Sequence, residues 1–216
     1  MRLHAHYRSS TSYRVRIALN IKGLAHEIVP VDLLAAEQRG AAFRALNPFS
    51  GVPVLEAGGR RYAQSMAIIE WLEESHPEPR LLPGGPEERY RARELAYAIA
   101  TELHAPLNLP VLQYLGREMA QEQAAIDRWY HHWLGKTLAP IELRLAGFDG
   151  GDFLFAAPGL FEAVLIPQLY NARRFGFDLG AMPRIRRIEA ACLALPAFVA
   201  AHPDNQPDSP GTGDGR

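Results

Sequence analysis

The segment RLHAHYRSSTSYRVRIALNIKG, residues 2–23, decides how the fold begins. Residues 2–7 alternate between apolar and polar types, which is typical of a half-buried strand. Ser9–Ser12 follow directly, and hydroxyl side chains are preferred where a helix starts because they accept hydrogen bonds from its free backbone N–H groups. Apolar residues then recur at the i, i+3, i+4 spacing of a helix as far as Gly23, which is expected to end it.

Working outward, the same alternation of strands, helices and breakers continues through the first third of the chain. Gly58-Gly59 is the strongest turn signal, because a two-residue hairpin turn favours residues that tolerate positive φ. The segments around it are expected to form strands at 26–31, 54–57 and 60–62, and helices at 35–45 and 65–76. The order is therefore βαβαββα, an α/β arrangement.

A proline- and glycine-rich stretch, PEPRLLPGGP at residues 77–86, predicts a linker after this block. Everything beyond it has helical patterning, with expected helices at 87–115, 122–146, 160–175 and 183–195. We therefore expect an α/β domain over residues 1–80, an all-α domain over 87–203, and a loose tail at 204–216 that has almost no apolar residue to bury.

Composition excludes several classes of protein. The 216 residues are 48% apolar and 22% charged, which is ordinary globular usage. Lys and Arg (23) nearly cancel Asp and Glu (24), so no overall field favours nucleic acid. Cys192 stands alone and cannot form an internal disulfide, the first residues lack a signal-peptide pattern, and no apolar run reaches the ~18 residues of a membrane span. These features predict a soluble, cytoplasmic protein with no membrane partner.

Three features of the first block predict a pocket for a peptide that carries negative charge. Ser9–Ser12 places hydroxyls and free N–H groups at the positive end of a helix dipole. Val52–Pro53 is a candidate cis peptide that exposes the backbone of Val52 to an extended peptide. Gln64–Ser65 opens a second helix and gives a second anion seat. Taken singly, the hydroxyl cluster is better explained by a good helix cap than by an anion site.

Five motifs carry a resemblance to a known family. They are SSTSYRVRIALNIKG at 9–23, LNPFSGVPVLE at 46–56, QSMAIIEWLEESHP at 64–77, LIPQLYNARRFGFDL at 165–179 and QPDSP at 206–210. Together they resemble the zeta class of glutathione transferases, the family of maleylacetoacetate and maleylpyruvate isomerases. The resemblance implies a thioredoxin-like N-terminal domain that binds glutathione, an all-helical C-terminal domain that supplies the substrate wall, and a homodimer.

The resemblance also implies roles for individual residues. Beside the glutathione sulfur it places the hydroxyls of Ser9, Ser10 and Thr11. Its implied glutathione contacts also include Gln38, Val52, Pro53, Gln64, Ser65, His104 and Asn108. Taken alone, His104 is better explained as a core or surface residue than as a ligand contact. Arginine is the natural partner of a carboxylate because its donors form a fixed fork. Arg8, Arg173 and Arg174 are thus candidates for binding a dicarboxylate substrate, and solvated surface charge is the alternative for each.

The chain departs from the family pattern at three places. Thr11 stands where members usually have cysteine in SSCS, which resembles the maleylpyruvate branch. Leu109 and Pro110 stand near positions where that branch has a further arginine, so the choice between maleyl acids stays open. At Gly159 the usual Ser or Thr helix cap is missing and only the acidic half of the capping box, Glu162, remains. The helix is expected to survive, because Gly is only a few tenths of a kcal/mol worse than Ser as a cap.

The histidines and the single cysteine predict neither a metal site nor a reactive protein thiol. His4 and His6 share a strand face without a third ligand, and His131-His132 point in different directions on a helix, so no metal is expected. Cys192 lies among Ala and Leu at helical spacing and is expected to be a small buried apolar residue.

We predict a glutathione-dependent cis–trans isomerase of a maleyl dicarboxylic acid, maleylacetoacetate or maleylpyruvate, in aromatic catabolism. Rotation about a C=C bond requires loss of its double-bond character, which reversible addition of a thiolate achieves. One alternative is a general glutathione transferase that conjugates electrophiles. The other is a non-catalytic ligand-binding protein that keeps the glutathione seat.

Overall fold

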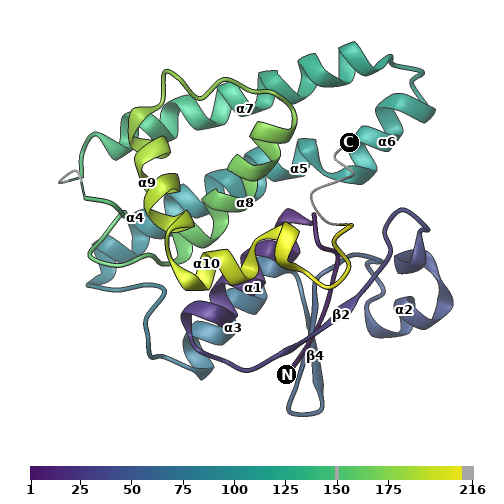
Figure 1. Ribbon diagram of the computed structural model, residues 1–216, viewed down its shortest axis with the longest axis horizontal. Coiled ribbons are helices and arrows are strands. Elements are labelled where there is room, and N and C mark those ends of the chain that lie inside the picture. The colour runs from purple at the N-terminus through teal and green to yellow at the C-terminus, as the bar shows by residue number, and fades with distance from the viewer. Residues whose placement is uncertain (149–150, 211–216) are drawn as a thin grey trace. The chain divides into compact units, whose positions relative to one another are not determined.

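The computed structural model describes residues 1–148 and 151–210, and the chain forms two compact units. One unit comprises Met1–Leu81 together with the chain from Leu193 onward, and the other comprises Leu82–Cys192. Figure 1 labels the elements of both units, which are described separately below.

The first unit is built on a four-stranded mixed sheet of order β2-β1-β3-β4. Its strands are β1 (Arg2–Ala5), β2 (Glu27–Pro30), β3 (Val54–Ala57) and β4 (Arg60–Ala63). β1 runs parallel to β2 and antiparallel to β3, and β3 forms a hairpin with β4. Gly58 and Gly59 make the turn with φ values of 56° and 75°, which confirms the predicted hairpin.

Helices cover both sides of this sheet (Figure 1). They are α1 (Ser10–Ile21), η1 (Glu37–Arg39), α2 (Ala41–Leu46), α3 (Ser65–Ser75), α10 (Pro196–Ala201) and η3 (Pro203–Asn205). α1 packs against α3 and α10. On the other side, Phe43 of α2 is buried with Val31 and Val54. The expected helix at 35–45 is instead two short helices, because Gly40 separates η1 from α2 in extended backbone.

The chain from Leu193 onward packs with the first unit, whereas we expected residues up to 203 to belong to the helical domain. α10 belongs to the first unit, where Asn20 Nδ2 donates to Ala197 O at 2.9 Å. The expected loose tail also differs over residues 204–210, because Gln206 Nε2 donates to Ala200 O and His202 O, both at 2.9 Å. Polar side chains thus bind backbone carbonyls and replace the missing apolar contacts. Residues 211–216 of that predicted tail lie outside the described residues.

A buried lysine ties the end of α1 to the chain that follows α3. Lys22 Nζ donates to Glu73 Oε2 at 2.9 Å and to the carbonyl oxygens of His76 at 2.6 Å and Pro79 at 3.0 Å. Glu73 Oε2 also accepts from Leu81 N at 2.9 Å. Both charged groups are therefore paired and hydrogen-bonded, as burial of an ion pair requires.

In the second unit, the regular elements of the described residues are helices, in agreement with the expected all-α domain. They are α4 (Pro86–Tyr97), the π-helical η2 (Ala98–Leu103), α5 (His104–Leu107), α6 (Leu109–Arg117), α7 (Gln123–Leu145), α8 (Leu160–Arg174) and α9 (Pro183–Leu193). α8 is the core helix, with 11 of its 15 residues buried, and it packs against α4. The prediction of one helix over 87–115 is wrong: Asn108 has extended backbone and caps α6, and Pro110 sits in its first turn.

α8 begins at Leu160, directly after Gly159, despite the missing hydroxyl cap, as expected. Glu162 is fully buried and its carboxylate accepts from Gly159 N at 2.8 Å and from Leu154 N at 2.6 Å. Burial raises the pKa of Glu162, and the backbone hydrogen bonds oppose that rise. The acidic half of the capping box therefore holds both the helix start and the preceding loop.

Candidate active site

The β1–α1 loop gathers the hydroxyl cluster at the start of α1. Ser9 is the N-cap of α1, and its Oγ accepts from Ser12 N at 3.2 Å. Ser9 Oγ lies 2.9 Å from Thr11 Oγ1, and Thr11 Oγ1 donates to Val52 O at 3.0 Å. The Val52–Pro53 peptide is cis, as predicted. The structure thus joins two of the three features that the sequence marked, the hydroxyl cluster and the X-Pro turn.

The number of hydroxyl protons shows which of Ser9 and Thr11 can donate a hydrogen bond to a ligand. A carbonyl oxygen only accepts, so the single hydroxyl proton of Thr11 is used on Val52 O. Ser9 must then be the donor in the contact between Ser9 and Thr11. Its proton can be redirected to an incoming anion without breaking the link between the loop and Val52. Ser9 is therefore the better donor to a sulfur anion, while Thr11 holds the loop in place.

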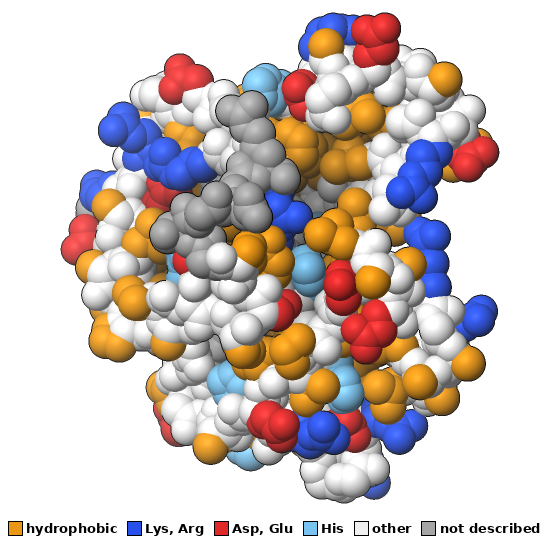
Figure 2. Space-filling view, turned by 45° about the vertical axis from the view of Figure 1, so that its right-hand side comes forward, with side chains coloured by type: hydrophobic (Ala, Val, Ile, Leu, Met, Phe, Trp, Pro, Cys, Tyr) orange, Lys and Arg blue, Asp and Glu red, His pale blue; other side chains and the backbone are white. Residues whose placement is uncertain are grey.

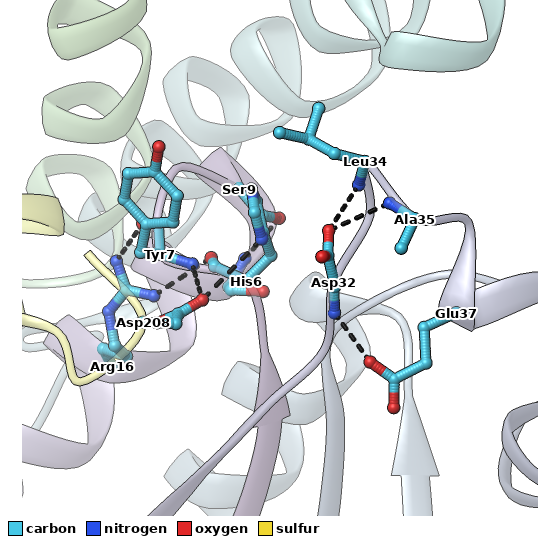
Figure 3. A network of polar contacts seen from close by, with 10 residues as sticks. His6, Tyr7, Ser9, Arg16, Asp32, Leu34, Ala35, Glu37 and Asp208 are labelled. Carbon is cyan, nitrogen blue, oxygen red and sulfur yellow. Dashed lines mark hydrogen bonds and ion pairs between the residues drawn. The ribbon is translucent and has the colours of Figure 1, made fainter. Parts of the chain in front are cut away.

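Two residues that the sequence analysis did not select fix this loop (Figure 3). Arg16, buried in α1, donates from Nη2 to Tyr7 O at 2.8 Å and from Nη1 to His6 O at 3.4 Å. Asp208, from the C-terminal segment, accepts from Tyr7 N at 2.9 Å. Burial lowers the pKa of His6, and the charge of Asp208 opposes that shift. The acid in the QPDSP motif was the available signal for Asp208.

Gln64 and Ser65 form a second candidate seat at the start of α3. Gln64 has φ 68° and ψ 109°, an unusual conformation for a residue with a side chain, and such outliers concentrate at ligand sites. Its side chain is exposed, whereas Ser65 is buried. The Oγ of Ser65 accepts from Arg14 Nη1 at 3.5 Å. A hydroxyl, a helix N-terminus and a cation therefore converge at this point, a combination that suits a carboxylate.

The side chain of Gln38 gives separate evidence that a peptide ligand fits the first unit. It lies in η1, is buried, and its Oε1 atom has no hydrogen-bond partner among the described residues. A buried carbonyl oxygen without a partner is unfavourable, so a ligand N–H or ammonium group would satisfy it. The donor and acceptor set of this unit fits a short anionic peptide such as glutathione. The loop before Gln38 is held by Asp32, whose Oδ1 accepts from Leu34 N and Ala35 N (Figure 3).

The second unit carries two of the glutathione contacts implied by the resemblance. His104 is the first residue of α5 and is half-buried. Asn108 is exposed, and its Oδ1 accepts from Leu109 N at 2.8 Å as the cap of α6. Capping uses the amide oxygen of Asn108 and leaves its NH₂ group for other contacts. For both His104 and Asn108, the contact with glutathione stays a prediction.

The three candidate arginines differ in how strongly they are engaged. Arg173 forms a bidentate pair with Glu189, with 2.8 Å between Nε and Oε1, and this hydrogen bonding raises the pKa of Arg173. Arg174 Nη1 makes a long hydrogen bond of 3.4 Å to Asn171 Oδ1. The guanidinium of Arg8 lies 5.2 Å from the ring centre of Tyr7. Because an internal carboxylate occupies the fork of Arg173, its guanidinium is less available to a substrate carboxylate.

Cys192 and the histidines that were considered as metal ligands have other surroundings in the described residues. Cys192 is 0% exposed, and its pKa is raised by burial and then by the charges of Glu162 and Glu189, as expected of a structural cysteine. In residues 1–148 and 151–210, no three His, Cys, Asp or Glu side chains are grouped as metal ligands. His4 Nε2 is instead bonded to Glu56 Oε1 at 2.5 Å.

One face of the molecule carries side chains of both charges. Basic and acidic side chains are interspersed on the face in Figure 2. Across residues 1–148 and 151–210, none of the helices combines the length and apolar character that crossing a membrane requires.

Comparison with known proteins places this geometry in a family. The family description "Glutathione S-transferase, N-terminal domain" matches residues 8–75. The maleylacetoacetate isomerase of Pseudomonas aeruginosa is 45% identical over 97% of this chain and 99% of its own length. Among solved structures, a bacterial zeta-class maleylpyruvate isomerase is 42% identical with a TM-score of 0.95, covering 97% of this chain and 100% of its own. The maleylacetoacetate isomerase of Anaeromyxobacter dehalogenans, with glutathione bound in its active site, is 46% identical with a TM-score of 0.86, covering 97% of both chains. The chain belongs to the zeta class of glutathione transferases, the family of the maleylacetoacetate and maleylpyruvate isomerases.

Proposed function

We propose that this protein is a glutathione-dependent cis–trans isomerase of a maleyl dicarboxylic acid, maleylacetoacetate or maleylpyruvate, in aromatic catabolism. The observation that carries the proposal is the hydroxyl cluster of Ser9 and Thr11, bonded to Val52 O at the N-terminus of α1 in a chain of this family. Relatives with 42–45% identity have the names of these two isomerases.

The chain's own residues hold glutathione and stabilise negative charge. Ser65 and the N-terminus of α3 would bind the γ-glutamyl carboxylate, Val52 the backbone of the cysteinyl unit, and Gln38 a ligand donor. Ser9 would donate its hydroxyl proton to the sulfur, and the dipole of α1 adds positive potential there. When bound, glutathione supplies a sulfur nucleophile whose reversible addition to the alkene permits rotation. Arg8 and Arg174 would hold the carboxylates of the substrate and stabilise charge that develops on it.

A spectroscopic assay tests this function against its two alternatives. The protein is mixed with a maleyl acid in the presence and absence of glutathione, and ultraviolet absorbance is followed. An isomerase converts the acid only when glutathione is present and leaves glutathione unchanged. Consumption of one glutathione per product would indicate a conjugating transferase, and absence of any reaction would indicate a ligand-binding protein.

We also propose that the protein is a cytoplasmic homodimer. The single reduced and buried Cys192 is compatible with a reducing compartment, and the family resemblance supports the dimer. Light scattering coupled to size exclusion measures the oligomeric state. A mass of one chain across the micromolar range would contradict the dimer.

Ser65→Ala is expected to raise the glutathione concentration needed for half-maximal rate far more than it lowers the saturated rate. The reason is that Ser65 contacts the ligand away from the reacting sulfur, so its loss weakens ground state and transition state alike. Initial rates at varied glutathione measure both quantities. An unchanged affinity for glutathione in a folded variant would contradict the seat at α3.

A substrate whose distal carboxylate is a methyl ester is expected to react about ten- to a hundredfold less efficiently than the free acid. The ester loses a charge-assisted hydrogen bond worth about 1.5 to 3 kcal/mol. Arg174→Met should narrow this preference more than Arg173→Met, because Arg173 is already paired with Glu189. Equal efficiency for ester and acid in the parent protein would contradict recognition by arginine.

A further inference from the structure

Arg14 is a buried cation that has no anionic partner among the described residues. Its side chain projects from α1 and is 1% exposed. Among the described residues, its Nε and Nη2 atoms have no hydrogen-bond partner. Its Nη1 atom donates to Ser65 Oγ over 3.5 Å, which is long for a hydrogen bond.

The burial of such a group is unfavourable unless something compensates for it. A charged side chain without a counter-ion is strongly destabilising in the interior of a protein. Burial lowers the pKa of Arg14 to about 9, so the guanidinium stays protonated at neutral pH. The first unit therefore keeps a positive charge inside the protein that its described residues do not neutralise.

The direction in which Arg14 points indicates where an anion would sit. Ser65 is the first residue of α3, an 11-residue helix whose N-terminus offers free N–H groups. When Ser65 Oγ accepts from Arg14, its own proton is available for an acceptor beyond it. The cation, the hydroxyl and the helix end therefore favour one anion at the same place.

We propose that Arg14 is a positioning residue and counter-charge for the carboxylate that binds at Ser65, the α-carboxylate of the γ-glutamyl unit. Arg14 orients the Ser65 hydroxyl as a donor and adds a positive charge behind it. The inference rests on the proposed function in that it takes glutathione as the ligand.

Arg16 provides a matched control on the same helix. It is as buried as Arg14, but its donors are used on the backbone oxygens of Ala201 at 2.9 Å, His6 at 3.4 Å and Tyr7 at 2.8 Å. Arg16 therefore stabilises the fold through neutral acceptors, whereas we infer that Arg14 pairs with an anionic group of the ligand. Replacing each should have opposite consequences for the ligand-free protein.

The test measures binding of two tripeptides by calorimetry. One is glutathione, and the other is γ-aminobutyryl-cysteinyl-glycine, which lacks only the γ-glutamyl α-carboxylate. The parent is expected to prefer glutathione, and Arg14→Met should reduce that preference about ten- to a hundredfold, the usual effect of a lost charged hydrogen bond. Arg14→Lys should retain part of the preference. Arg16→Met should weaken both ligands equally.

The free energy of unfolding without ligand separates a ligand-binding role of Arg14 from a purely structural one. Loss of a purely structural arginine would lower it. Arg14→Met is expected to be at least as stable as the parent without ligand, because an unpaired buried charge is removed, and Arg16→Met is expected to be less stable. An Arg14→Met variant that is unfolded, or that prefers glutathione as strongly as the parent, would overturn the role of Arg14. A parent that binds neither tripeptide would instead contradict the proposed function.

Discussion

Ser9→Ala is expected to raise the pKa of the bound glutathione thiol by about one to two units and to lower kcat/KM at neutral pH about ten- to a hundredfold. The substitution removes a hydroxyl donor to an anion, worth about 1.5 to 3 kcal/mol, and each 1.4 kcal/mol of preference for the charged form is one pKa unit. Thiolate absorbance of bound glutathione against pH measures the shift directly.

Thr11 and Cys192 are the controls for this prediction. Thr11→Val should change the thiol pKa less than Ser9→Ala, because the proton of Thr11 is used on Val52 O. Cys192→Ala should change neither the titration nor the turnover rate, because the Cys192 thiol is buried in α9 of the second unit. A folded Cys192→Ala variant that loses activity, or a Ser9→Ala titration that matches the parent, would contradict this account of the thiolate.

Lys22→Met is expected to lower the free energy of unfolding by about 3 to 5 kcal/mol. Glu73 would then be a buried carboxylate without its cation, and breaking one partner of a buried ion pair has this cost. The carbonyl oxygens of His76 and Pro79 would lose their donor as well. Urea denaturation followed by circular dichroism measures the change.

Glu78→Gln is the matched control, because its ion pair with Arg80 lies on the surface, with side chains 72% and 52% exposed. Exposed pairs contribute little, so stability should change by no more than about 0.5 kcal/mol. Similar losses for Lys22→Met and Glu78→Gln would mean that the Lys22 network does not hold the end of α3.

Local patterns predicted the elements of the first unit well. The hydroxyl cap at Ser9, the hairpin at Gly58-Gly59 and the cis bond at Val52–Pro53 all depend on conformational preferences of a few adjacent residues. Such preferences are visible in the sequence because they need no distant partner. The core helix α8 was likewise predicted, since its apolar residues and Glu162 give a strong local signal.

Long-range contacts account for what the sequence did not reveal. The place of α10 depends on hydrogen bonds between residues nearly 180 positions apart, such as Asn20 to Ala197. Asp208 reaches the β1–α1 loop across 201 positions. Arg14 left a weak signal, because it falls three and four residues before Ile17 and Ala18 on the buried face of α1. A charged residue in that stripe is uncommon, and the structure shows that Arg14 has no anionic partner among the described residues.

Counting the turnovers for each glutathione molecule shows whether glutathione acts as a cofactor or is consumed. A maleyl acid is incubated with the protein and a small fraction of one equivalent of glutathione, proton NMR follows the cis and trans alkene signals, and mass spectrometry measures glutathione at the end. We expect complete conversion to the trans acid, with the starting glutathione recovered unchanged. Conversion that stops when glutathione is exhausted, or that proceeds at the same rate without glutathione, would contradict this expectation.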